Sequence, residues 1–136
     1  MESRGGRFVN MPTVQHFEIA VDEVQRAQEF YQKVFGWTMQ KMTNAVRPEE
    51  DYWIFETKDD NGNQGLSGGM MKRQSPRQTV TNYISVSSID DYSSKINQSG
   101  GQVIIPKTIL PDRGYIAICL DSENNMFGLF EQKINK

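Results

Sequence analysis

The sequence predicts an α+β domain composed of two βαβββ modules that pack together. Two observations support this fold class. In each half of the chain, alternating apolar and polar residues give way to apolar residues at helical spacing. The halves also repeat at a shift of 65 residues, so that Ile19 meets Ile84 and Gly36 meets Gly101. Because one helix covers only one face of a module's sheet, the two modules should form a single domain.

The first half begins with a strand at residues 14–21, where Phe17, Ile19 and Val21 form an apolar face. A helix follows, with a capping-box signal at Asp22 and Gln25. Gly36 ends this helix. Three further strands are expected at residues 37–42, 51–58 and 65–71. The apolar stripe of the helix should contain five residues: Val24, Ala27, Tyr31, Val34 and Phe35.

The second half repeats this order. A strand at residues 81–86 leads to a helix whose capping positions are Ser87 and Asp90 and which ends at Gly100 and Gly101. The last three strands are expected at residues 102–106, 114–120 and 126–131. Here the halves align at a shift of 63 residues, which matches Trp53 with Ile116, Phe55 with Ile118 and Gly65 with Gly128.

The 136 residues are enough for one domain. We expect residues 1–11 to be a flexible segment and residues 12–134 to form the domain, with modules at about 13–72 and 79–132. A net charge of −2 with both signs dispersed argues against nucleic-acid and membrane partners. A single cysteine and the lack of a long apolar run favour a cytoplasmic protein.

Two stretches, HFEIAVDEVQRAQEFYQKVFGW and GYIAICLDSENNMFGLFE, carry a family likeness. Together with the duplicated βαβββ pattern, they resemble the glyoxalase/bleomycin resistance/dioxygenase family, also called the vicinal oxygen chelate superfamily. The resemblance runs from about Val14 to Glu131. It implies that the strands form a cupped mixed sheet with the helices on its outer face, and that the protein is a homodimer.

The resemblance also implies a site for a divalent metal, at the positions of His16, Gly65, Thr81 and Gly128. A catalytic metal needs about three imidazole, carboxylate or thiolate ligands, and glycine supplies none. Glu131 is three residues beyond Gly128, which turns it to the other face of a regular strand. We therefore expect no metal and no other cofactor, with a divalent metal held through His16 as the alternative.

His16, the only histidine, and Glu18 share the polar face of the first strand. They are the candidate catalytic residues, because an imidazole and a carboxylate facing one cavity can act as acid and base. Simpler interpretations also stand: a hydrogen-bonded histidine and a surface glutamate.

Four further residues are candidate ligand-binding groups. Alternation of side chains along the strands places three aromatic residues on the inner face of the cup: Tyr83, Tyr115 and Phe130. Glu56 joins them if its strand turns Tyr52 and Ile54 inward. The alternative for these aromatic residues is ordinary core packing. Cys119 should lie on the same face of its strand as Tyr115, and we expect it to be a buried, unreactive thiol.

Loop cations at the mouth of the cup could select an anionic substrate, although exposed loop charge is the simpler interpretation. These residues are Arg47, Lys72, Arg73, Arg77, Lys107 and Arg113. The leading functional hypothesis is a metal-independent protein that binds a small organic molecule. If it is an enzyme, the resemblance implies a reaction similar to that of lactoylglutathione lyase or of a dioxygenase. The alternatives are a metal-dependent lyase, isomerase or dioxygenase that uses His16, a dimer that sequesters a drug, and an interaction module without a small ligand.

Overall fold

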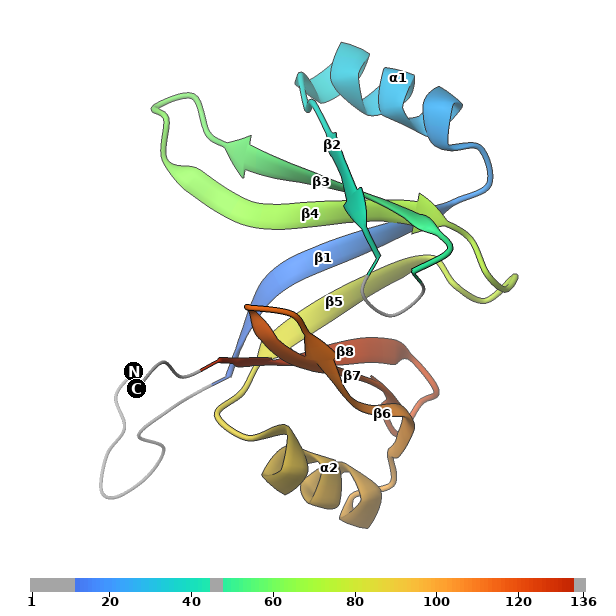
Figure 1. Ribbon diagram of the computed structural model, residues 1–136, viewed down its shortest axis with the longest axis vertical. Coiled ribbons are helices and arrows are strands. Elements are labelled where there is room, and N and C mark those ends of the chain that lie inside the picture. Colours follow the sequence, from blue (N-terminus) through green and yellow to red (C-terminus); the bar gives the residue numbers. More distant parts are fainter. Residues whose placement is uncertain (1–11, 45–47, 134–136) are drawn as a thin grey trace.

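The computed structural model describes residues 12–44 and 48–133 (Figure 1). The predicted N-terminal segment, Arg47 and residue 134 lie outside the described residues. The first module contains β1 (Thr13–Val21), α1 (Val24–Phe35), β2 (Gln40–Thr43), β3 (Asp51–Lys58) and β4 (Gln64–Lys72). The second contains β5 (Val80–Ser85), α2 (Ile89–Gln98), β6 (Gln102–Leu110), β7 (Gly114–Leu120) and β8 (Met126–Gln132).

The eight strands form one mixed sheet in the order β2-β3-β4-β1-β5-β8-β7-β6. Each module closes with a parallel pair, β1 with β4 and β5 with β8. The antiparallel pair of β1 and β5 joins the modules at the centre of the sheet. Figure 1 shows the sheet curling between α1 and α2, which lie at opposite ends on its outer side. The predicted α+β class with two βαβββ modules is therefore confirmed.

Apolar residues on the outer face of the sheet bind each helix to its own module. Under α1, the buried side chains are Ile19, Val21, Phe55 and Met70, as the period of two in the first strand predicts. Under α2, a second core contains Val86, Ile89, Ala117, Cys119 and Leu129. The inner face is thereby left for other side chains.

The helix boundaries differ in detail from those expected. α1 begins after Glu23, and no side chain caps its first turn, so the capping box at Asp22 is wrong. Ser88, rather than Ser87, caps α2 by accepting a hydrogen bond from the Asp91 backbone N–H at 3.1 Å. Gly36 ends α1 in the left-handed conformation, with φ 76°, as predicted.

The predicted stripe of α1 is too wide. Val34 is 55% exposed and Phe35 is 57% exposed, so only the earlier apolar residues pack against the sheet, and these are partly buried. The strand expected at residues 37–42 also starts late, because Trp37 and Met39 pack against the α1 core before β2 begins. The sheet therefore covers a narrower face of α1 than the sequence predicts.

The shift of 63 residues does not preserve the face of the sheet. Trp53 and Phe55 pack under α1, whereas their expected counterparts Ile116 and Ile118 lie in a cluster with Tyr83 on the inner face. Because side chains alternate along a strand, an error of one residue moves a whole strand to the wrong face. The strand register contains irregularities that a constant shift cannot represent, one of them between Glu56 and Lys58.

The turns before β4 and β8 are built alike. Asp59 and Asp121 each accept hydrogen bonds at 2.8–2.9 Å from the backbone N–H groups two and four residues later. These backbone bonds hold the pKa of both carboxyl groups below the usual value. The repeat in the sequence therefore reflects a repeated turn as well as repeated strands.

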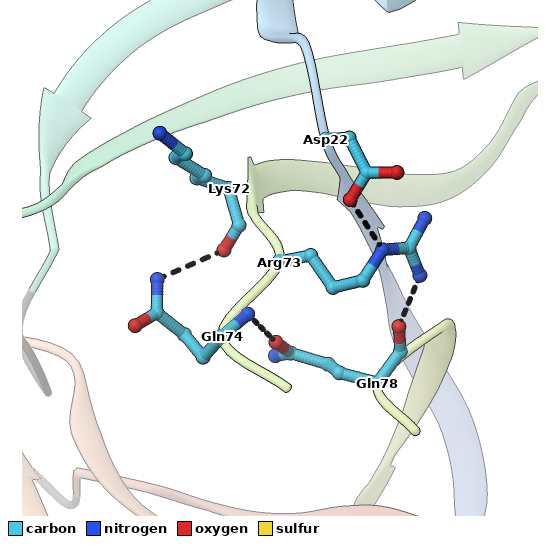
Figure 2. Close-up of polar contacts among 5 residues, drawn as sticks. All are labelled: Asp22, Lys72, Arg73, Gln74 and Gln78. Carbon is cyan, nitrogen blue, oxygen red and sulfur yellow. Dashed lines mark hydrogen bonds and ion pairs between the residues drawn. The ribbon is translucent and has the colours of Figure 1, made fainter. Parts of the chain in front are cut away.

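The segment between the modules is held by side-chain contacts (Figure 2). Arg73 donates from Nε to Asp22 at 2.9 Å and from its guanidinium to the carbonyl oxygen of Gln78. The backbone N–H of Gln74 donates to the side-chain oxygen of Gln78 at 2.7 Å. The side-chain amide of Gln74 donates to the backbone carbonyl of Lys72 at 3.0 Å. Arg73 thus ties this connection to the end of β1. No helix in the described part of the chain is long and apolar enough to cross a membrane.

Candidate functional site

A cavity of about 270 Å³ opens on the inner face of the sheet. Both modules line it: β1, β2, β3 and β4 from the first, and β5, β6, β7 and β8 from the second. Its apolar wall consists of Met42, Ile54, Leu110, Ile116 and Phe130. Apolar walls around a few converging polar groups are typical of small-molecule sites.

His16 lies on this surface with both ring nitrogens in contact. Its Nδ1 is 2.6 Å from the hydroxyl of Ser67, and its Nε2 is 2.9 Å from the hydroxyl of Tyr52. Ser67 stands opposite His16 in the parallel pair of β1 and β4. Burial lowers the pKa of His16 to about 4, and the nearby positive charge of Arg113 acts in the same direction. The imidazole is therefore neutral at pH 7.

Glu18 is buried two residues further along β1 and is 9% exposed. The hydroxyl of Tyr83 is 3.4 and 3.5 Å from its two carboxyl oxygens, and Tyr52 also hydrogen-bonds to it. Burial raises the pKa of Glu18, while the bonds from Tyr52 and Tyr83 partly oppose this shift. We call Ser67, His16, Tyr52, Glu18 and Tyr83 the polar cluster.

Two proton arrangements fit the chain of contacts from Ser67 to Glu18. With Glu18 protonated, its O–H donates to Tyr52, whose O–H donates to His16 Nε2, and Nδ1–H donates to Ser67. With Glu18 ionised, every donor reverses: Ser67 donates to Nδ1, Nε2–H donates to Tyr52, and Tyr52 donates to the carboxylate. The loss of one proton at Glu18 is thus coupled to a change of the His16 tautomer.

Two glycines make room for the tyrosines of the polar cluster. A Cβ on Gly69 of β4 would collide with the hydroxyl of Tyr52. A Cβ on Gly128 of β8 would collide with the ring of Tyr83. Both rings can therefore lie across the sheet because the neighbouring strand carries no side chain at the point of contact.

Arg113 lines the cavity from the turn between β6 and β7. Its backbone N–H donates to Leu110 at 3.0 Å, and its carbonyl accepts from Lys133 at 3.0 Å. Within residues 12–44 and 48–133, no hydrogen bond or ion pair to its guanidinium is found. Its charge is nevertheless close enough to affect the titration of His16 and Tyr52.

The structure brings four of the six candidate residues into the cavity wall: His16, Glu18, Tyr83 and Phe130. The placement predicted for Tyr115 is wrong. Its ring packs on the outer face against the α2 core, beneath the ammonium group of Lys107 at 4.6 Å. Cys119 lies on that face too, where burial raises its pKa to about 11.

Glu56 also lies away from the cavity. β3 does turn Tyr52 and Ile54 inward, which was the condition for including Glu56. Glu56, however, comes later on the strand, is exposed, and accepts a hydrogen bond from the side chain of Gln64 at 3.2 Å. The alternation of side chains predicts which face of the sheet a residue lies on, but its position along the strand decides whether it reaches the cavity.

The donors present do not fit a metal centre. No three His, Cys, Asp or Glu residues in the described part of the chain lie close enough to share an ion. Ser67, not Gly65, is the residue of β4 beside His16, so the position assigned to Gly65 was out by two residues. Glu131 faces α2, as its spacing predicts, and accepts from the Ile89 backbone N–H at 2.8 Å.

A second hollow of about 270 Å³ adjoins the first, and Glu18 and Tyr83 contribute to both walls. Thr81, the remaining expected metal position, lines this second hollow. Gln74 and Gln78 from the connection between the modules line it as well, and Figure 2 shows Gln78 in contact with both Gln74 and Arg73.

Three residues of the site were not selected from the sequence. Tyr52 could have been placed by its alternation with Trp53 and Phe55, which are typical core residues. Ser67 is the only polar side chain within the run GLSGGMM, which is a weaker signal. Arg113 was one of six loop cations, and nothing in the sequence separates it from the others.

Comparison with known proteins agrees with this architecture. Residues 13–57 match the family model described as bleomycin resistance protein-like N-terminal, and this span covers β1 to β3. A search of curated proteins found no match.

Several solved structures share the fold over most of the chain. A methylmalonyl-CoA epimerase from Streptomyces coelicolor, solved with 2-nitronate-propionyl-CoA, has a TM-score of 0.67 at 12% identity, covering 93% of this chain and 99% of its own. A hypothetical protein from Bacillus halodurans has a TM-score of 0.66 at 14% identity, with coverages of 93% and 99%. The methylmalonyl-CoA epimerase of Mycobacterium tuberculosis has a TM-score of 0.61 at 14% identity, with coverages of 88% and 87%. This chain therefore shares the fold of these structures, and residues 13–57 of its first module match the bleomycin resistance protein-like N-terminal family model.

Proposed function

We propose that the protein binds a small organic molecule in the cavity and holds it through the polar cluster rather than through a resident metal. One observation carries this proposal: hydrogen-bonding groups from both modules converge on a single hollow with an apolar wall. Buried polar groups cost free energy unless they have partners, and such clusters are typical of functional sites. The match to a family named for bleomycin resistance supports a small organic ligand.

Chemistry on the ligand is a second candidate, favoured by the coupling between Glu18 and His16. A carboxyl group with a raised pKa close to a neutral imidazole can exchange a proton with a bound ligand. His16 and Glu18 are then the acid–base pair. The methylmalonyl-CoA epimerases that share this fold were solved with acyl-CoA compounds bound. A proton-transfer reaction on a carbonyl compound is the class that this arrangement suits.

The metal-dependent alternative has less support. Both nitrogens of His16 already contact hydroxyl groups, and a metal ligand would have to give up one of these contacts. A homodimer and a cytoplasmic location remain predictions. The exposed apolar residues Phe30, Val34 and Phe35 near the end of α1 offer a surface on which a second copy could pack.

The test uses two adjacent residues of β6. Leu110 lines the cavity, whereas Ile109 is 63% exposed and does not. A thermal-shift screen against aldehydes, thiol adducts, aromatic drugs and sugar acids identifies ligands, because binding to the folded state raises its melting temperature. We expect Leu110→Trp to abolish binding of each hit and Ile109→Trp to retain it.

Two controls accompany this comparison. The circular dichroism spectra of both variants must match the wild type, so that a loss of binding reports the cavity. Dialysis against a chelator should leave the affinity unchanged. The proposal is wrong if no compound stabilises the protein, or if both tryptophan variants bind equally well.

A further inference from the structure

Arg113 is the only cation among the described residues of the cavity wall, and no described residue forms an ion pair with it. Arg73 is paired with Asp22 at 2.9 Å, and Lys107 is paired with Asp90 at 3.3 Å. The guanidinium of Arg113 has no such contact among the described residues, although it lies against the cavity. An arginine can present five N–H donors, and this one has them free to meet a ligand.

The backbone around Arg113 is held firmly. Its N–H and carbonyl are both used, by Leu110 and Lys133. Gly114 follows with φ 146°, and a Cβ there would collide with the carbonyl oxygen of Glu131 on β8. Asp112 before it has φ 65°, a conformation that aspartate tolerates in turns. Backbone contacts thus hold the start of the Arg113 side chain beside the cavity.

The remaining titratable groups of the cavity favour their neutral forms. Burial lowers the pKa of His16 and raises the pKa of Glu18, Tyr52 and Tyr83. Arg113 is the only lysine or arginine among the described residues that line the cavity. A ligand that carries a negative charge is therefore attracted to this guanidinium.

We propose that the ligand is a small organic acid whose carboxylate binds Arg113 at the cavity mouth and whose uncharged oxygen-bearing end reaches the polar cluster. This inference rests on the proposed function and names the class of ligand for the same site. The planar fork of a guanidinium matches a carboxylate with two parallel hydrogen bonds. The apolar wall of Leu110, Ile116 and Phe130 then contacts the body of the ligand.

The volume limits the size of this acid. At about 30 Å³ for each water-sized group, a cavity of about 270 Å³ holds about nine such groups. Phenylacetate is of about this size, and 4-hydroxyphenylacetate adds a hydroxyl at the end opposite its carboxylate, where the polar cluster should recognise it. Their amides, phenylacetamide and 4-hydroxyphenylacetamide, have nearly the same shape without the charge.

The experiment measures dissociation constants for these four compounds and for phenyl phosphate from the shift of the His16 ring resonances. We expect each acid to bind at least about tenfold more tightly than its amide, because hydrogen bonds to charged groups are the stronger ones. Arg113→Gln should remove this preference, and Arg113→Lys should restore only part of it. Arg26→Gln is the matched control, since Arg26 is exposed on α1 and outside the cavity.

The outcomes separate this inference from the proposed function. Equal binding of acids and amides overturns the inference but leaves a ligand-binding cavity in place. A preference for phenyl phosphate over both acids also overturns it, as does an equal loss in Arg113→Gln and Arg26→Gln. Failure of all five probes overturns the inference as well. The proposed function itself falls only if no compound of the wider screen binds in a manner sensitive to Leu110→Trp.

Discussion

The titration of His16 gives a direct measure of how strongly the cavity disfavours charge. Its pKa falls from 6.5 to about 4 on folding, because the ring is buried and Arg113 is close. Between these two values the unfolded chain binds a proton that the folded protein does not. The folded state therefore loses stability as the pH falls from about 6.5 to about 4.

The size of this loss follows from the shift itself. Each unit of pKa difference corresponds to about 1.4 kcal/mol, so a shift from 6.5 to about 4 amounts to about 3 kcal/mol. A protein of this size has a stability of about 5–15 kcal/mol. His16 alone should thus account for a large part of any acid sensitivity in that range of pH.

The chain has one histidine, so its ring resonances can be assigned without ambiguity. An NMR titration should show a pKa well below 6 for His16. Urea unfolding of the wild type and His16→Gln between pH 7 and pH 4 gives the same quantity from stability. Relative to the variant, the wild type should lose about 3 kcal/mol over this range.

Glu18 acts in the opposite sense in the same interval. Its raised pKa means that the folded state holds a proton that the unfolded chain releases, so its contribution falls as the pH rises above 4.5. Glu18 is buried in the wild type as well, so the comparison with His16→Gln removes only the part of this effect that does not depend on His16. A His16 pKa near 6.5 would refute the argument that burial and Arg113 lower it. Curves of stability against pH that run parallel for the wild type and His16→Gln would refute it as well.

Three further predictions concern packing and assembly. Gly69→Ala should displace Tyr52 and raise the pKa of His16 toward its ordinary value, which the same NMR titration would detect; an unchanged titration contradicts the assigned role of the glycine. Ser88→Ala should cost about 1 kcal/mol of stability in urea unfolding, because α2 loses its N-cap; a loss near zero would show that the hydroxyl contributes nothing. If the chain is a dimer through α1, Phe30→Glu combined with Phe35→Glu should reduce the mass measured by light scattering to that of a monomer, since both side chains are more than half exposed; a wild-type monomer would end the dimer prediction.

The fold could be predicted from the sequence because the patterns that indicate its strands and helices are local and occur in both modules. The apolar face of Phe17, Ile19 and Val21 needs only alternation, and the left-handed turn at Gly36 needs only a glycine after a helical stripe. The second module repeats both signals, so each half supports the interpretation of the other. Fold prediction therefore depends on features that span about ten residues.

The site was less predictable because it depends on register between strands distant in the sequence. His16 and Tyr52 are 36 residues apart, and His16 and Ser67 are 51 apart. A constant shift cannot describe strands that contain bulges, and the resulting error of one residue put Tyr115 on the wrong face. Residues on β1 were placed correctly because they needed no alignment with the second module.

The glycine at position 128 shows why a metal site cannot be restored by one substitution. The family resemblance assigns this position to a metal ligand, yet the ring of Tyr83 occupies the space that any side chain there would need. A glutamate at this position would first have to displace Tyr83, which would remove a hydrogen-bond donor from the buried carboxyl of Glu18. Tyr52 and Gly69 stand in the same relation in the first module. Each module has thus placed a tyrosine over a glycine, and the two tyrosine hydroxyls meet at Glu18, which makes this side chain the centre of the site.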